Sequence, residues 1–264
     1  MESELASLVR RHGGEPICVP AMREVERDFT GEAARAIDAI ASAGAVVVLA
    51  TGVGLQRWLD VAATLGRGPE MHDALARATV VCRGPKPIAV LKREGLSAHV
   101  RAPAPHTTRE LLDALGAVDV RDRDLVFVHD GGGSPVVPES LAQRGARIVE
   151  VRPYVWALPE DIQPLEALVR RLVDGTVDAL AITTQVQARH LFDVAASIRA
   201  RDALVEALRG RVVVAAVGPT CARTLEALGT PPHVVPDPPK MGPLVLALAR
   251  HFGRGASEDP DRPR

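Results

Sequence analysis

The stretch VVVAAVGPTCARTLEALG, from Val212 to Gly229, decides the fold class of this chain. Its β-branched opening is typical of a buried strand, because the apolar run is too unbroken for a strand with one exposed face. Gly218 permits a tight turn, and Pro219 suits the first helical turn, where no backbone N–H is needed. Apolar residues then recur at helical spacing until Gly229, a typical helix end. The stretch therefore predicts a buried strand, a Gly-Pro turn and an amphipathic helix.

The same pattern occurs earlier, in the segment TVVCRGPKPIAVLKREG at residues 79–95. Its Gly84 corresponds to Gly218 and is likewise followed by proline. The segment WLDVA, which starts at Trp58, similarly resembles LFDVA, which starts at Leu191, and the two pairs have nearly the same offset along the chain. Nearly equal offsets at separate motifs predict an internal duplication, with two domains of similar fold.

Strands that alternate with helices predict parallel sheets covered on both faces, that is, doubly wound α/β domains. The short N-terminal piece pairs with the C-terminal half, so the middle of the chain is an inserted domain. The predicted boundaries are residues 1–20 and 157–252 for domain 1, 23–150 for domain 2, 151–156 for a crossover linker and 253–264 for a disordered tail. The other strands are predicted at Ile17–Val19, Ala45–Ala50, Ala98–Val100, Leu125–His129, Arg147–Val151, Ala179–Ile182 and His233–Val235.

The duplication also predicts that domain 1 lacks a strand. The segment Leu141–Pro153 resembles Leu8–Pro20, but only the former follows a strand, at Leu125–His129. In a sheet of order 2-1-3-4-5 that first strand is central, so its absence leaves two neighbouring strands unpaired. A start codon placed too far downstream, or a modified domain, would explain the difference, and the former is the preferred interpretation.

Composition excludes several classes of protein. The 264 residues carry a formal net charge of −1, which argues against nonspecific nucleic-acid binding. The chain has no apolar run of the roughly 20 residues that span a bilayer, and no signal-peptide pattern, so a cytoplasmic protein without a membrane partner is expected. Cys18, Cys82 and Cys221 lack zinc-ligand spacing and are predicted to be buried thiols rather than a metal site.

Several motifs together resemble the uroporphyrinogen-III synthase family, over nearly the whole chain from Glu4 to Arg250. They are ATGVG at residues 50–54, Thr183-Thr184 after the corresponding strand, the VGPTxAxxLxxxG pattern at residues 217–229, and a lone Tyr154 at the second crossover. The resemblance implies two flavodoxin-like domains, joined by a two-stranded crossover, that flank a cleft. It also implies cyclisation of linear hydroxymethylbilane to uroporphyrinogen III, with inversion of ring D, in haem, sirohaem or cobalamin biosynthesis. No metal or cofactor is implied, and the expected state is a monomer that makes at most transient contact with the upstream deaminase.

The implied substrate carries many carboxylates, which free N–H groups at helix N-termini and hydroxyls can bind. The turns at the carboxyl ends of the predicted strands supply both, at the edge where open α/β sheets bind ligands. The candidate substrate-binding residues are Thr51, Gly52, Arg83, Gly84, Lys86, Thr107, Thr108, Thr183, Thr184, Gly218, Pro219 and Thr220, with Arg101, His106 and Arg109 as weaker basic candidates. For the threonines the alternative is simple N-capping, and for the basic residues it is a solvated surface charge.

Tyr154 is the candidate catalytic residue, because an acid near the departing hydroxyl would help its loss. The alternative is that the ring only packs beside Trp156. Other functions are also conceivable, and a non-catalytic sensor of tetrapyrroles or small acids on the same fold is the main one. A two-lobed periplasmic-type binding protein is disfavoured by the absent signal sequence, and a GxGxxG nucleotide site by the missing third glycine after Gly54.

Overall fold

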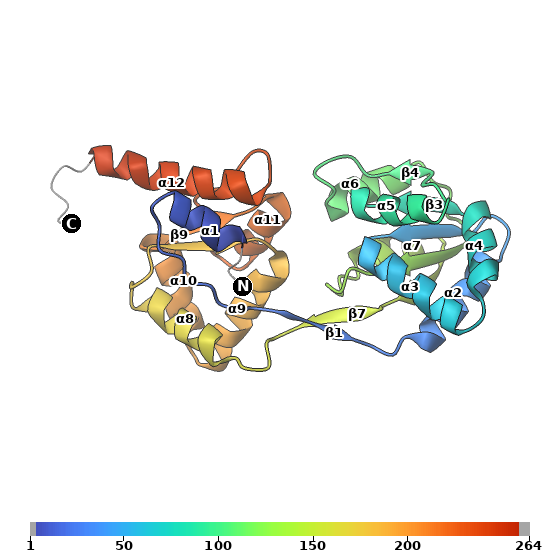
Figure 1. Cartoon of the computed structure of the whole chain (residues 1–264), viewed down its shortest axis with the longest axis horizontal. Helices are drawn as coiled ribbons and strands as arrows, with labels where there is room; N and C mark the ends of the chain where they lie inside the picture. Colours follow the sequence, from blue (N-terminus) through green and yellow to red (C-terminus); the bar gives the residue numbers. More distant parts are fainter. Residues whose placement is uncertain (1–3, 259–264) are drawn as a thin grey trace. The chain divides into compact units, whose positions relative to one another are not determined.

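The computed structural model describes residues 4–258, which form twelve helices and nine strands of an α/β fold with parallel sheets (Figure 1). By internal contacts the described residues divide into two compact units. Residues 4–23 and 157–258 form unit 1, and Glu24–Trp156 form unit 2. Within residues 4–258, no helix is long and apolar enough to cross a bilayer.

Unit 2 is built on a five-stranded parallel sheet in the order β4-β3-β2-β5-β6. When β5 and β6 are counted as the first two strands, this is the doubly wound order 2-1-3-4-5. Central β2 is buried along its whole length, as its unbroken VVVL sequence requires. The elements of this unit are α2 (Thr30–Ile40), β2 (Val46–Leu49), α3 (Gly52–Thr64), α4 (Gly68–Arg77), β3 (Thr79–Cys82), α5 (Pro85–Arg93), β4 (Val100–Arg101), α6 (Thr108–Leu115), β5 (Asp124–Val128), α7 (Val136–Gln143) and β6 (Arg147–Val151).

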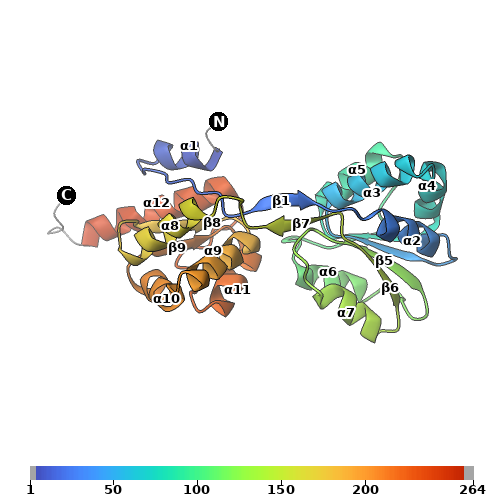
Figure 2. The same cartoon turned by 90° about the horizontal axis from the view of Figure 1, so that it is seen from below.

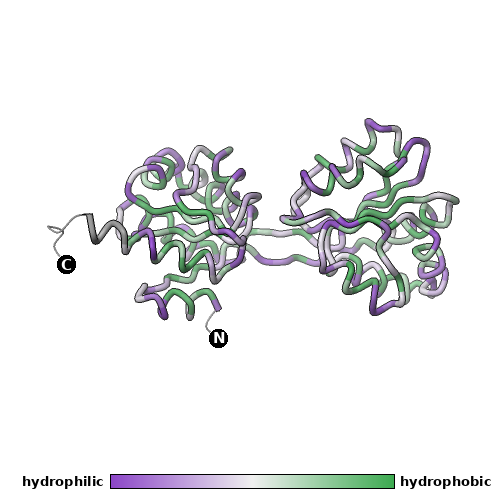
Figure 3. The backbone as a smooth tube through the Cα atoms, turned by 90° about the horizontal axis from the view of Figure 1, so that it is seen from above, coloured by the Kyte–Doolittle hydropathy of each residue, from purple (hydrophilic) through white to green (hydrophobic). Residues whose placement is uncertain are grey.

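Helices cover both faces of this sheet. Helices α2, α3, α4 and α5 pack on one face around the buried Trp58, whose indole N–H donates to the carbonyl of Ala33 at 3.2 Å. Helices α6 and α7 pack on the other face, around Leu111, Leu115 and Leu141 (Figure 2). In Figure 3 the hydrophobic stretches follow the strands through the interior of each unit, and hydrophilic stretches lie on outer turns and helices.

Strands β1 (Arg23–Glu26) and β7 (Tyr154–Ala157) form a two-stranded sheet of their own (Figure 1). Residues 151–156, predicted as the crossover linker, fall within compact unit 2 when the chain is divided by internal contacts. The reason lies in β7: the backbone N–H of Trp156 donates to the carbonyl of Gly131 at 3.3 Å, and Tyr154 is buried.

Unit 1 has a smaller sheet, in which β8 pairs in parallel with β9. Helices α8 to α11 pack on one face, and α12 packs on the other, where α1 also contacts it (Figure 2). The elements are α1 (Glu4–Arg11), α8 (Gln163–Val173), β8 (Ala179–Ile182), α9 (Gln185–Ser197), α10 (Arg201–Gly210), β9 (Val213–Ala216), α11 (Pro219–Ala227) and α12 (Met241–Glu258).

Two strands predicted for unit 1 are not formed. Residues 17–19 lie outside any helix or sheet, and Cys18, predicted to be buried, is exposed. In unit 2 the strand that corresponds to residues 17–19 is β6, which pairs only with β5. The described residues of unit 1 contain no counterpart of β5. The prediction at His233–Val235 is reduced to a single bridge between Ala215 and Val234, and Val235 is exposed.

Two helices were not predicted from sequence, α4 and α10, whose first residues Gly68 and Arg201 have nearly the same offset as the repeated motifs. Each has an acidic residue in its first turn and a basic one in its last turn, which favours a helix despite its polar sequence. The predicted tail begins at residue 253, and residues 253–258 continue α12. After Pro243 in the first turn of this helix, the next proline is Pro260, and the rest of the predicted tail lies outside the described residues.

Candidate active site

The carboxyl edge of the sheet in unit 2 brings together residues from three neighbouring strand ends. Thr51 follows β2, Arg83 follows β3, and Asp130 follows β5. Because β2 lies between β3 and β5, side chains from the two outer strands can meet across the end of the central one. They do so here: Arg83 Nη1 donates to Asp130 Oδ2 at 2.6 Å.

Tyr154 lies buried beside this edge, with 3% of its surface exposed. Its hydroxyl contacts the side chain of Thr51, and the Arg57 guanidinium lies 5.0 Å from the ring centroid. Trp156 packs edge-on, with 5.5 Å between ring centroids. Burial raises the pKa of Tyr154 above its usual value although the contact with Thr51 lowers it, so the phenol is protonated at neutral pH and can donate a proton.

The glycine loop, defined here as Gly131–Gly133, covers Tyr154. Gly131 has φ +80°, and a Cβ built there would lie 2.4 Å from Tyr154 Cε2. A side chain at this position would collide with the ring and strain the backbone, so the close approach requires glycine. The sequence DGGG after a strand indicates a turn, but it does not reveal the contact with the tyrosine.

Asp130 was not among the predicted site residues. Its carboxylate accepts from Arg83 and, through Oδ1, from the backbone N–H of Gly132 at 3.1 Å. Its backbone carbonyl accepts from the indole N–H of Trp156 at 3.0 Å. Burial raises the pKa of Asp130, but the charge and hydrogen bond of Arg83 and the Gly132 N–H outweigh it, so the pKa lies below its usual range.

The remaining candidates of unit 2 surround the start of α5. Gly52 packs against Lys86, since a Cβ at Gly52 would lie 2.8 Å from the Lys86 carbonyl oxygen, while the Lys86 side chain is exposed. The ring of His106 lies beside Gly84, and its Nδ1 lies 3.0 Å from the carbonyl oxygen of Ala102. Arg101 and Arg109 are exposed, as a solvated surface charge would be.

The predicted threonines behave differently from one another. Thr51 is the N-cap residue of α3, but its side chain makes no capping hydrogen bond. Thr107 forms a capping box with Glu110, with Thr108 as the first residue of α6, and Thr184 forms one with Gln187. Capping therefore accounts for Thr107 and Thr184, and Thr51 is left for another role.

In unit 1 the corresponding edge carries the other predicted residues. Thr183 donates through its N–H and hydroxyl to Gln187 Oε1, both at 3.0 Å. Gly218 is the N-cap residue of α11, followed by Pro219 and Thr220, which are both partly buried. Cys221 beneath this turn is buried, which raises its pKa to about 11, so it is a neutral thiol. In unit 2, burial likewise raises the pKa of Cys82, to about 12.

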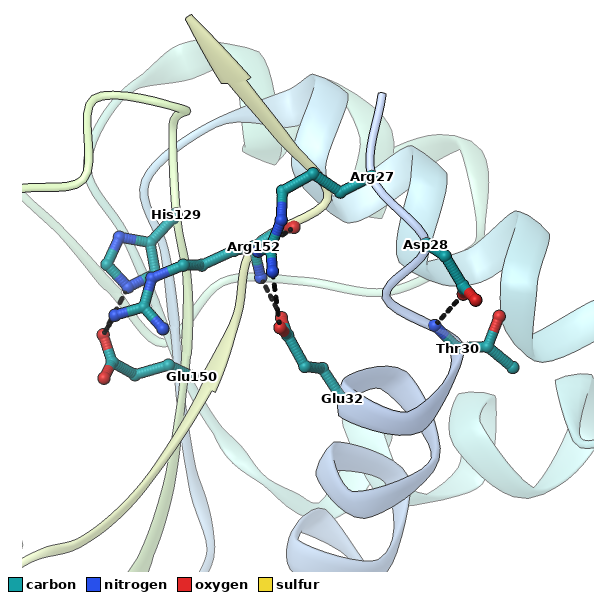
Figure 4. Close-up of polar contacts among 7 residues, drawn as sticks. All are labelled: Arg27, Asp28, Thr30, Glu32, His129, Glu150 and Arg152. Atoms are coloured by element: carbon teal, nitrogen blue, oxygen red, sulfur yellow. Dashed lines mark hydrogen bonds and ion pairs between the residues drawn. The ribbon is translucent and has the colours of Figure 1, made fainter. Parts of the chain in front are cut away.

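A polar network anchors the chain just before Tyr154 (Figure 4). Glu150 Oε2 lies 2.6 Å from Nε2 of the buried His129 and accepts from Arg152 Nη2 at 2.6 Å. The backbone N–H of Arg152 donates to Glu32 at 2.8 Å, and Arg27 donates to the Arg152 carbonyl at 3.2 Å. The network ties β5, β6 and α2 to the segment that enters β7. Within residues 4–258, no cluster of three or more His, Cys, Asp or Glu side chains is arranged to hold a metal ion.

Comparisons with known proteins find similar sequences over nearly the whole chain. Residues 3–245 match the family model described as Uroporphyrinogen-III synthase HemD. The chain is 28% identical over 256 residues to the uncharacterized protein YjjA of Bacillus subtilis, covering 94% of this chain and 92% of that protein.

Two solved structures of uroporphyrinogen III synthase from Thermus thermophilus are also similar. A mutant form of that enzyme has a TM-score of 0.74 at 27% identity, covering 97% of this chain and 94% of that one. A wild-type crystal form has a TM-score of 0.59 at 29% identity, covering 96% and 94%. The family model spans far more than half of the sequence, and the chain therefore belongs to the uroporphyrinogen-III synthase family.

Proposed function

We propose that this chain is a working uroporphyrinogen-III synthase, a lyase that closes linear hydroxymethylbilane with inversion of ring D. One observation carries the proposal: the single tyrosine of a synthase-family chain lies at a sheet edge with its protonated hydroxyl on Thr51. A neutral phenol held in this way is a hydrogen-bond donor of fixed orientation, suited to a leaving hydroxyl.

The reaction requires little of the protein beyond one proton donor and a site that holds the substrate in a folded conformation. The terminal hydroxyl leaves as water: its C–O bond breaks, a proton joins the oxygen, and the pyrrole nitrogen supplies the electrons that form the azafulvene. The substituted carbon of ring D then bonds to the exposed methylene, and the resulting spiro intermediate fragments and recloses with ring D inverted. Loss of one water balances the reaction without oxidant or reductant. Most of the acceleration would come from holding the two ends of the linear substrate together.

In this proposal the two compact units are flavodoxin-like domains, each presenting a carboxyl sheet edge to substrate. Arg83 and Lys86 supply positive charge, and most of the other predicted positions supply backbone N–H groups and hydroxyls. Thr51, Gly52, Gly84, Thr108, Gly218 and Thr220 carry such groups. Thr107, Thr183 and Thr184 would exchange their present contacts with Glu110 and Gln187 for contacts with substrate. Pro219 has neither group, and its part is to begin α11 at the edge of the sheet. One arginine and one lysine among many neutral donors are suited to an acidic substrate, because they attract its carboxylates and still allow the product to be released.

Product analysis tests the proposal. The full chain is incubated with hydroxymethylbilane, and the porphyrins obtained after oxidation are separated by chromatography. We expect the ring-D-inverted isomer, at a rate proportional to the concentration of the chain. The same isomer distribution as in a reaction without protein would overturn the proposal. Tight tetrapyrrole binding without turnover would instead indicate the non-catalytic sensor.

A further inference from the structure

Asp130 lies where three parts of the candidate active site meet. Its carboxylate binds Arg83 on one side and the N–H of Gly132, in the glycine loop, on the other. Its backbone carbonyl holds the indole of Trp156, whose ring packs against Tyr154. One residue thus contacts a predicted substrate-binding cation, the loop over the predicted catalytic tyrosine, and the aromatic neighbour of that tyrosine.

The ion pair is placed to orient Arg83 without hiding it. The Arg83 side chain remains 28% exposed while its Nη1 is engaged by Asp130. An arginine has five N–H donors in a rigid fork, so a contact at one end leaves others for a second carboxylate. Asp130, in turn, is held in place because it lies just after β5 and uses both carboxylate oxygens.

We propose that Asp130 is a positioning residue, which couples the orientation of Arg83 to the closed position of the glycine loop over Tyr154. The inference rests on the proposed function, because it assigns Arg83 to a substrate carboxylate and Tyr154 to the leaving hydroxyl. Removing the charge of Asp130 frees Arg83 to rotate and loosens the contact with Gly132. Substrate binding and proton donation then worsen together.

The same strand offers a matched control. Asp124 begins β5 at the opposite edge of the sheet and accepts from Arg147 Nε at 2.7 Å. Asp124→Asn therefore removes one carboxylate charge and one arginine contact, as Asp130→Asn does just beyond the other end of the strand. Only Asp130 lies beside Tyr154, whereas Asp124 lies at the amino end of the strand.

The first measurement needs no substrate. Tyr154 is the only tyrosine, so tyrosinate absorbance during an alkaline titration reports this residue alone. Burial raises the pKa of Tyr154 most, and the carboxylates of Asp130 and Glu24 raise it further. The contact with Thr51 and the charge of Arg57 lower it. Asp130→Asn should therefore shift the titration midpoint to lower pH, and Asp124→Asn should leave it at the wild-type value. Equal midpoints for all three proteins would overturn the coupling.

The second measurement is steady-state kinetics at neutral pH, with Arg83→Gln and the Arg83→Gln/Asp130→Asn double variant included. We expect Asp130→Asn to raise KM and lower kcat, with a loss of about 10- to 100-fold in kcat/KM. The double variant should be no worse than the poorer single variant, because both act through one contact. Asp124→Asn should keep wild-type kcat and KM.

The outcomes separate the two proposals. If the wild type makes no ring-inverted product, the proposed function fails, and the tyrosine titration still decides the coupling. If the wild type is active and Asp130→Asn matches it in kcat and KM while melting at a lower temperature, Asp130 is merely structural and the inference is wrong. Should Asp130→Asn not fold, Arg83→Gln carries the kinetic test, because it removes the same contact and leaves the Asp130 contact with Gly132. Wild-type kinetics in that variant would also overturn the proposal.

Discussion

His99 and His233 make the same hydrogen bond in the two units of this chain. In unit 2, His99 Nδ1 accepts from the backbone N–H of Val80 at 3.1 Å, and in unit 1 His233 Nδ1 accepts from Val214 at 3.0 Å. Each histidine also donates its backbone N–H to the backbone carbonyl of the same valine at 2.8 Å. The two valines and the two histidines have the same offset along the chain, so the duplication persists in contact geometry as well as in sequence.

This shared contact can be tested through stability. His99→Ala and His233→Ala should each lower the free energy of unfolding by about 1 kcal/mol, because a backbone N–H at a sheet loses its acceptor. His12→Ala, at an exposed histidine, should have no effect. Urea unfolding followed by circular dichroism measures all three variants. If only one of these two variants has a lower free energy of unfolding than the wild type, the two contacts are not equivalent.

Tyr154→Phe tests the catalytic donor. The variant keeps the ring that packs against Trp156 and loses only the O–H. We expect kcat to fall roughly 10- to 100-fold with little change in KM, the pattern of an interaction made mainly in the transition state. Initial rates of product formation measure it, with the melting temperature as a check on folding. A wild-type kcat would assign Tyr154 to packing alone.

Arg83→Ala and Lys86→Ala test the electrostatic part of substrate binding. Each should raise KM, and the increase should be larger at low ionic strength because salt screens partly exposed charges. Lys92→Ala is the matched control, since Lys92 is exposed near the other end of the same helix, α5. The measurement is KM at two salt concentrations. If Lys86→Ala and Lys92→Ala behave alike, Lys86 is a solvated surface charge.

His129 predicts a loss of stability in mild acid. Burial lowers the pKa of this histidine below 6.5, although its hydrogen bond with Glu150 raises it. The charge of Arg152 also lowers the pKa, and the charge of Asp130 raises it. The unfolded chain therefore takes up a proton that the folded chain resists. Stability should be constant above pH 6.5 and fall below it, with a slope of at most about 1.4 kcal/mol per pH unit from this one group.

His129→Gln removes the titrating group and should flatten this part of the curve. Denaturant unfolding between pH 5 and pH 8, at about half-unit steps, compares the two proteins. The same slope in the variant and the wild type would assign the acid sensitivity to other residues.

The sheets were predictable because their strands are mostly continuous apolar runs. The prediction at Arg147–Val151 coincides with β6, and that at Ala179–Ile182 coincides with β8. The segment Ile17–Val19 has the same local pattern, but a strand forms only when a neighbour supplies hydrogen bonds, and here none is present among the described residues. Helices α4 and α10 were missed although each has an apolar face at helical spacing. The buried residues are Met71, Ala74 and Leu75 in α4, and Leu204, Ala207 and Leu208 in α10.

The candidate site was predictable only in outline. Turns after strands directed attention to Thr51 and Arg83, because the edge of a parallel sheet is set by topology. The role of Asp130 depends on which side chains meet across the end of β2, and β3 and β5 are far apart in the sequence, with α5, β4 and α6 between them. Likewise, Gly131 and Tyr154 lie close together because β7 runs beside the glycine loop, where the Trp156 N–H donates to the Gly131 carbonyl, and no local pattern encodes this contact.

The division of the chain has a consequence for its synthesis. Unit 2 is continuous, from Glu24 to Trp156, whereas unit 1 needs residues from both before and after it. Domains generally fold as units while the ribosome adds about 5–20 residues per second. The inserted unit can therefore complete its five-stranded sheet while the C-terminal part of unit 1 is still untranslated. Helix α1 can pack against its partner α12 only after the rest of unit 1 has been synthesised, because α12 follows all other described elements in the chain.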